Sequence, residues 1–312
     1  MVESLRVRAV DALVAGLVDY AGLFPPASES MRTALEKYAS YREGDDRSAL
    51  GRFIVPVSRL EELENAASDL MPRGAASEPW HLSALIVENA RVAGDAILDF
   101  NARHGSGSRD GRAVIDVVEL KASSANDIAR YRLEVPEALP VYFEIPIRSG
   151  VTALVEAIAR GGARAKVRTG GVTPESIPPA GEVVDFIIAC QRAGVPFKAT
   201  AGLHHPLRGS YRLTYEGDSP VGTMYGFLNV FLASVLIHAG QSRATAIAAL
   251  EETDPSAFVF DDDAIVWRGK QITAEQIEAS RRDFATSFGS CSFREPVDEL
   301  AALTRATPTG NL

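Results

Sequence analysis

Two lysines within short apolar runs are the residues of this chain best suited to chemistry. Lys166 lies in the run Ala-Lys-Val-Arg and Lys198 in the run Phe-Lys-Ala-Thr, and glycines follow both runs. Residues 183–193 between them have apolar side chains at helical spacing, so the unit reads as strand, helix, strand, about one βαβ repeat long. A lysine amine attacks a carbonyl only when unprotonated, and a second cation nearby favours that neutral form. The pair therefore indicates imine chemistry.

Composition limits the class of protein. The chain has 312 residues, 46% hydrophobic content and a net charge of −9, and no basic block is present that could neutralise phosphates, so nucleic acid is not expected as a partner. Cys190 and Cys291 lie far apart without metal-ligand spacing, which argues against a disulfide framework or a zinc site. The most apolar run, 227–239, is too short to cross a bilayer. We expect a soluble, cytoplasmic protein that acts on a small molecule.

Elements alternate regularly along the first two thirds of the chain. Near-continuous apolar strands that alternate with helices are typical of a parallel sheet covered on both faces. Seven such units favour a closed (β/α)8 TIM barrel as a single domain, preceded by an N-terminal helix over 3–17. The other expected helices are 31–41, 59–70, 90–104, 125–131, 151–160 and 183–193, and the expected strands are 18–23, 52–57, 81–87, 113–120, 139–145, 165–168 and 197–200.

The alternation breaks after His205. Residues from about 207 to 287 are expected to form an insertion between strands seven and eight, with helices at 226–240 and 243–252, a hairpin at 257–267 and a helix at 273–287 that Thr273 caps. Residues 288–293 are the candidate eighth strand, and 296–304 the closing helix. A stripe of Phe227, Phe231 and Val235 belongs either to the core or to the face of a homo-oligomer.

Five stretches resemble, in chain order, motifs of the class I aldolase barrels, most closely 2-deoxyribose-5-phosphate aldolase. The likeness covers roughly residues 18–203. The matching stretches are Val-Asp-Tyr-Ala-Gly-Leu-Phe-Pro at 18–25, Val-Ile-Asp-Val-Val at 114–118, Val-Tyr-Phe-Glu at 141–144, Lys-Val-Arg-Thr-Gly with Gly-Val-Thr-Pro-Glu at 166–175, and Lys-Ala-Thr-Ala-Gly-Leu at 198–203.

The resemblance implies roles for several residues. Lys166 matches the family's imine-forming lysine, and Lys198 matches the second lysine that assists it. Asp116 matches the acid of strand four, which would relay protons with Lys198, and Glu144 lies in the matching strand-five run. Glu119 competes with Asp116 for the acid's role, because the two lie on opposite faces of a regular strand and the register is open. The reaction needs no cofactor.

Substrate contacts are expected around the same strand ends. Asp19 and Tyr20 of strand one are expected to line the pocket. Glycine-rich loops expose backbone N–H groups that bind carboxylate or phosphate, and the residues proposed for this purpose are Arg168, Thr169, Gly170, Gly171 and Arg208.

The chain also departs from the family. Arg168 replaces a small serine and adds a cation to the face of Lys166. His204 and His205 stand where the family builds part of its phosphate site, and one of them is expected to bind substrate. The strand-eight signature is absent.

Two other functions compete with the aldolase hypothesis. Glu144 with His204 or His205 and a further acid could hold a divalent metal in a metal-assisted barrel enzyme. The barrel could also be a non-catalytic binding protein in which the lysines have only structural roles. The leading hypothesis is a class I aldolase-like lyase that acts on a small anionic carbonyl compound, with no metal.

Overall fold

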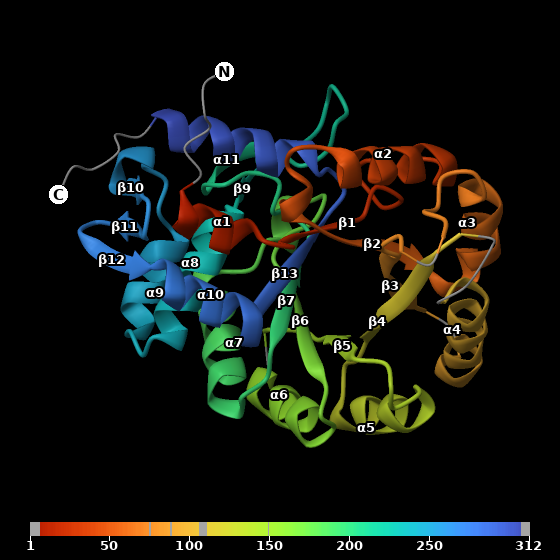
Figure 1. Cartoon of the computed structure of the whole chain (residues 1–312). Coiled ribbons are helices and arrows are strands. Elements are labelled where there is room, and N and C mark those ends of the chain that lie inside the picture. Colours follow the sequence, from red (N-terminus) through yellow and green to blue (C-terminus); the bar gives the residue numbers. More distant parts are fainter. Residues whose placement is uncertain (1–6, 75, 88, 106–110, 149, 307–312) are drawn as a thin grey trace.

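A closed barrel of parallel strands is the centre of the molecule. The computed structural model describes residues 7–74, 76–87, 89–105, 111–148 and 150–306. Within this part of the chain, eight strands close in the order β1-β13-β7-β6-β5-β4-β3-β2, which is the predicted (β/α)8 TIM barrel (Figure 1). The barrel strands are β1 Val18–Tyr20, β2 Leu50–Pro56, β3 Trp80–Ile86, β4 Ala113–Lys121, β5 Val141–Glu144, β6 Arg164–Arg168, β7 Phe197–Thr200 and β13 Ala285–Ser290.

Helices surround the barrel, as Figure 1 shows. Two of them begin at side-chain caps that the sequence provides: the Ser30 side chain accepts the N–H of Thr33 at the start of α2, and the Asn89 side chain accepts those of Arg91 and Val92 at the start of α4. The helices are α1 Arg8–Val14, α2 Met31–Glu43, α3 Leu60–Ala67, α4 Ala90–His104, α5 Ala125–Glu134, α6 Val151–Arg160, α7 Ala180–Ala193, α8 Phe227–His238, α9 Arg243–Leu250, α10 Ala274–Asp283 and α11 Arg294–Ala306. Of the helix expected at 3–17, α1 covers Arg8–Val14; residues 15–17 are not helical, and residues 3–6 lie outside the described residues. None of the described helices is long and apolar enough to span a membrane.

The segment between β7 and β13 holds more structure than the sequence predicted. It contains an antiparallel hairpin of β8 Gly209–Arg212 and β9 Val221–Met224, for which the sequence predicted no element. The expected hairpin at 257–267 is β10 Phe258–Asp261 with β11 Ala264–Trp267, and a further strand, β12 Lys270–Thr273, completes that sheet. The mostly polar side chains of β12 gave no strand signal. Thr273 caps α10 in a complete capping box, as expected.

The eighth strand begins three residues earlier than expected. Helix α10 ends at Asp283, and β13 runs over Ala285–Ser290 between β1 and β7 instead of over 288–293. Thr286 and Ser287 look like the polar positions of an amphipathic helix, but their hydroxyls bond inside the barrel, to the Phe197 carbonyl and the Asp19 carboxylate. Barrel contacts therefore decide where the helix ends.

The apolar helix α8 is part of the core. Phe227 and Phe231 are 1% exposed, and both rings pack against Phe288 of β13. Val235 is buried on the same helix. The stripe is therefore interior packing and not a face exposed to another copy of the chain.

Gly226, which precedes α8, is expected to tolerate no side chain. A Cβ there would overlap the Pro206 carbonyl and the Leu207 Cα, while that carbonyl accepts the N–H of Leu228. Gly226→Ala should lower the free energy of unfolding by about 1–3 kcal/mol, because backbone must move to make room.

Urea denaturation measures this change. Gly217 is a matched control, since it is exposed and a Cβ there meets nothing within 4 Å, so Gly217→Ala should have little effect. Equal stability of the two variants would contradict the prediction.

Candidate active site

The two lysines lie side by side in the barrel. Lys166 of β6 and Lys198 of β7 are direct Cα partners, and Glu144 of β5 is the partner of Lys166 on its other side. Period-two alternation of strand side chains directs all three toward the barrel interior. The juxtaposition expected from the βαβ spacing is thus present.

Glu119 of β4 joins the two lysines. Lys198 Nζ lies 2.6 Å from Glu119 Oε1 and 2.6 Å from Asp19 Oδ2. Lys166 Nζ lies 2.7 Å from Glu119 Oε2 and 2.9 Å from Glu144 Oε2. Charges therefore alternate in sign from Asp19 through both lysines to Glu144, which removes most of the cost of burying them.

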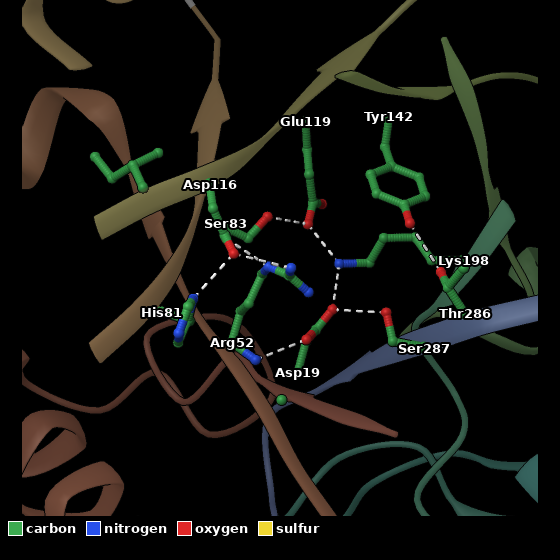
Figure 2. A network of polar contacts seen from close by, with 12 residues as sticks. Asp19, Arg52, His81, Ser83, Asp116, Glu119, Tyr142, Lys198, Thr286 and Ser287 are labelled. Carbon is green, nitrogen blue, oxygen red and sulfur yellow. Dashed lines mark hydrogen bonds and ion pairs between the residues drawn. The ribbon is translucent and has the colours of Figure 1, made fainter. Parts of the chain in front are cut away.

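Hydroxyl groups complete this network, as Figure 2 shows. Ser83 of β3 donates to Glu119 Oε1 at 2.6 Å, and Ser287 of β13 donates to Asp19 Oδ2 at 2.8 Å. Sequence reasoning missed both serines, because an isolated serine in an apolar strand carries no signal of what it contacts across a barrel.

The network keeps Glu119 and Lys198 charged. Burial alone would raise the pKa of Glu119, but the charges of Lys166 and Lys198 outweigh it and hold that pKa well below its ordinary value. Burial alone would lower the pKa of Lys198, but Asp19 and Glu119 outweigh it and raise that pKa above its ordinary value. Lys198 is therefore a buried cation at neutral pH, with no free electron pair for attack on a carbonyl.

Asp116 does not take part in the lysine network. It accepts a bidentate pair from Arg52 at 2.6 and 3.0 Å and lies 3.0 Å from His81 Nδ1 (Figure 2). The register of β4 against β3 shifts between the partners of Leu82 and Ser83, so Asp116 and Glu119 both point into the barrel although they are three residues apart. Glu119 occupies the place by the lysines for which Asp116 was expected.

A cavity of about 720 Å³ opens over the carboxyl ends of the strands. Active sites of (β/α)8 enzymes lie at this end of the barrel. Lys166, Glu119 and Glu144 line the cavity, whereas Lys198 and Asp19 are not among the described residues that line it. The network therefore has one lysine open to the cavity and one closed off. Further lining residues are Lys121, Leu85, Thr200, Gly202, Leu213, Met224, Gly289 and Cys291.

The glycine-rich loop after β6 forms one wall of the cavity. Arg168 is half exposed there, and its Nε lies 3.1 Å from Glu144 Oε1. Gly170 and Gly171 line the cavity as well. Thr169 has a structural contact instead, because its hydroxyl donates to the Ala201 carbonyl at 2.8 Å.

Five of the expected substrate contacts are not among the described residues that line the cavity: Asp19, Tyr20, Thr169, His205 and Arg208. Asp19 is in the lysine network, and the Tyr20 hydroxyl donates to Glu29 at 2.7 Å. The Arg208 backbone N–H donates to Asn229, and no hydrogen-bond partner for the buried Arg208 Nε is present among the described residues.

The adjacent histidines have different partners. His204 lines the cavity, with Nδ1 2.9 Å from Glu295 Oε2 and Nε2 3.9 Å from Cys291 Sγ. His205 stacks on Tyr211 and bonds Glu299. Across the described residues, no group of three or more His, Cys, Asp or Glu side chains is arranged to hold a metal ion.

Burial alone would lower the pKa of His204, but its bonds to Cys291 and Glu295 outweigh this and raise the pKa to about 9. Sequence reasoning could not identify Cys291 or Glu295 as partners of His204, because they lie far along the chain.

Glu119→Gln should destabilise the fold strongly. It leaves two buried lysines with one carboxylate each, and breaking a buried ion pair costs about 3–5 kcal/mol. Urea unfolding at pH 7 measures the loss, and Glu62→Gln, which breaks only the surface pair with Arg59, is the control. An unchanged free energy of unfolding for Glu119→Gln would contradict this role.

Acid should reduce the difference between wild type and Glu119→Gln. The Glu119 pKa is depressed in the folded state, so its contribution is complete above the unfolded pKa of about 4.3 and declines as pH falls toward the lower folded value. Unfolding at pH 7 and at pH 3.5 should therefore show a smaller gap at the lower pH.

His204 should make stability fall in mild base. Its pKa rises from about 6.5 in the unfolded chain to about 9, so its contribution is complete below 6.5 and is lost as pH rises through 9. His204→Gln should flatten the decline in unfolding free energy between pH 6.5 and 9.5, and Glu295→Gln should flatten it partly. Identical slopes in wild type and His204→Gln would exclude this effect.

No protein-family model matches the chain, and no curated protein sequence matches it. The (β/α)8 barrel commonly carries enzymes, and it supports many unrelated reactions, so its presence alone does not select one.

Proposed function

We propose that this protein is an imine-forming lyase of the class I aldolase type that acts on a small carbonyl compound with an anionic group. The observation that carries the proposal is the position of Lys166. It is the lysine of the buried pair that lines the cavity, and two carboxylates contact its amine. An amine that must lose a proton before attack is thus beside groups that can accept one.

The reaction follows from that arrangement. The neutral Lys166 amine adds to the substrate carbonyl, water leaves, and an iminium ion forms. A base removes the proton of the hydroxyl on the β carbon, and the bond between the α and β carbons breaks. The β carbon leaves as an aldehyde, the first product, while the electron pair of the broken bond moves to the iminium and gives an enamine. Protonation of the enamine carbon and hydrolysis of the imine release the second product and restore the amine.

Lys198 and Glu119 support this chemistry from below the cavity. The cation of Lys198 favours the ionised form of Glu119, which keeps a proton acceptor 2.7 Å from Lys166 Nζ. Glu119 therefore takes the relay role for which the resemblance suggested Asp116. Glu144 is the second acceptor, and its pKa, which burial would raise, is lowered by Lys166 and Arg168.

The rim of the cavity suits an anionic substituent. Arg168 and Lys121 both line it and are solvent-accessible, so they can turn toward a ligand without exposing buried charge. The exposed backbone of Gly170 and Gly171 adds N–H groups of the kind that bind carboxylate or phosphate oxygens.

Borohydride trapping tests the proposal. Incubation with small aldehydes, ketones and 2-oxo acids, followed by reduction, should give a stable adduct on Lys166 by intact mass and peptide mapping. Lys166→Met should lose the adduct. Lys270→Met is the control, because that lysine is exposed on β12 and is not among the described residues that line the cavity, and it should keep the adduct.

Other outcomes would overturn the proposal or its assignments. An adduct on Lys198 alone would reverse the roles of the lysines. The absence of an adduct across the whole panel, together with activity that a chelator abolishes, would favour the metal-assisted alternative. Trapping that a chelator leaves unchanged agrees with the imine mechanism.

A further inference from the structure

A second reactive group lines the same cavity. Cys291 follows β13 directly, and its Sγ lies 3.9 Å from His204 Nε2. The other nitrogen of that ring, Nδ1, lies 2.9 Å from Glu295 Oε2. Thiol, imidazole and carboxylate therefore stand in series on the wall of a cavity large enough for a small molecule.

This series is the arrangement that activates a nucleophile. The imidazole takes the proton of the thiol, and the carboxylate orients the ring and stabilises its charged form. Helix α11 begins at Arg294, three residues after Cys291, and the positive end of a helix favours a thiolate. The Ser292 hydroxyl accepts the N–H of Glu295 and so fixes the carboxylate-bearing first turn.

We propose that Cys291, His204 and Glu295 form an activated-thiol site that adds to the carbonyl carbon of a small aldehyde bound in this cavity. The Cys291 thiolate forms the sulfur–carbon bond, the π pair of the carbonyl moves to oxygen, and the His204 imidazolium donates its proton to that oxygen. The product is a thiohemiacetal, and the reverse steps release the aldehyde. The site is independent of the imine proposed for Lys166.

The surroundings of the thiol agree with ionisation. The His204 pKa of about 9 means that the imidazolium form is available at neutral pH. The chain's other cysteine, Cys190, is fully buried, and burial raises its pKa. The titratable and charged groups that face Cys291, directly or across an adjoining hollow, are His204, Glu295, Tyr215, Tyr20, Tyr41, Glu29 and Lys37.

Alkylation kinetics test the thiol. The rate constant for alkylation of Cys291 by iodoacetamide should reach half of its maximum well below pH 8.5, which is the ordinary pKa of a cysteine thiol. His204→Gln should move the midpoint upward by at least one pH unit and slow alkylation at pH 7 by about tenfold. Peptide mapping assigns the label, and Cys190 of the folded protein is the internal control that should remain unmodified.

Two further variants separate activation from folding. Tyr215→Phe removes a hydroxyl that contacts both Cys291 and Glu295 but leaves the His204 contacts, so the midpoint should stay low. Glu295→Gln should raise it. A midpoint at or above 8.5 in wild type, or a profile that His204→Gln leaves unchanged in a variant that still unfolds cooperatively, would overturn the proposal.

Competition tests the carbonyl ligand. Propionaldehyde should slow the alkylation of Cys291 in the variant Lys166→Met, where no imine can form at position 166. In this variant Glu119 keeps Lys198 as a partner, and Glu144 keeps Arg168. Full recovery of the rate after dialysis is expected, because the thiohemiacetal is reversible. No protection at any aldehyde concentration would overturn the assignment of the ligand class.

Discussion

The buried carboxylate of Glu119 is the constraint on which the rest of the barrel depends. A single carboxylate in the interior would be costly, and so would either lysine alone. Glu119 meets both lysines and a serine, and this places a polar group from β3, β4, β6 and β7 at one point. Asp19 and Ser287 extend the network to β1 and β13. Each strand must hold its register for these contacts to form, because a slip by one residue would turn its polar group away.

The same network separates two environments for chemically identical side chains. Lys198 lies below the cavity between two carboxylates and is 1% exposed, so it can only supply charge. Lys166 is 6% exposed and lines the cavity, so a substrate can reach its amine. This difference follows from the position of the cavity at the strand ends, and it is the basis on which the two lysines are proposed to have different roles.

The sequence predicted what repeats locally and missed what depends on distant contacts. The helical spacing of apolar residues predicted both ends of α4 and of α6 correctly. The length of the βαβ repeat predicted that the two lysines lie on neighbouring strands. The choice between Asp116 and Glu119 could not be made, because a register shift in β4 is set by its neighbours. The start of β13 was predicted wrongly for a similar reason. Thr286 and Ser287 continue the helical spacing of polar residues, and only their hydrogen bonds inside the barrel show that they belong to a strand.

The group of Cys291, His204 and Glu295 shows this limit most clearly, because its members come from separate parts of the chain. His204 follows β7, whereas Cys291 and Glu295 lie between β13 and the first turn of α11, beyond the whole inserted segment. Barrel closure pairs β7 with β13 and so brings the two loops to one wall of the cavity. The hairpin β8–β9 adds Leu213 and Met224 to the lining. Charged groups of β4 to β6 and the thiol of Cys291 after β13 thus line the same cavity. A ligand whose anionic end is bound by Arg168 would therefore have its uncharged end free to contact the apolar side chains and the thiol.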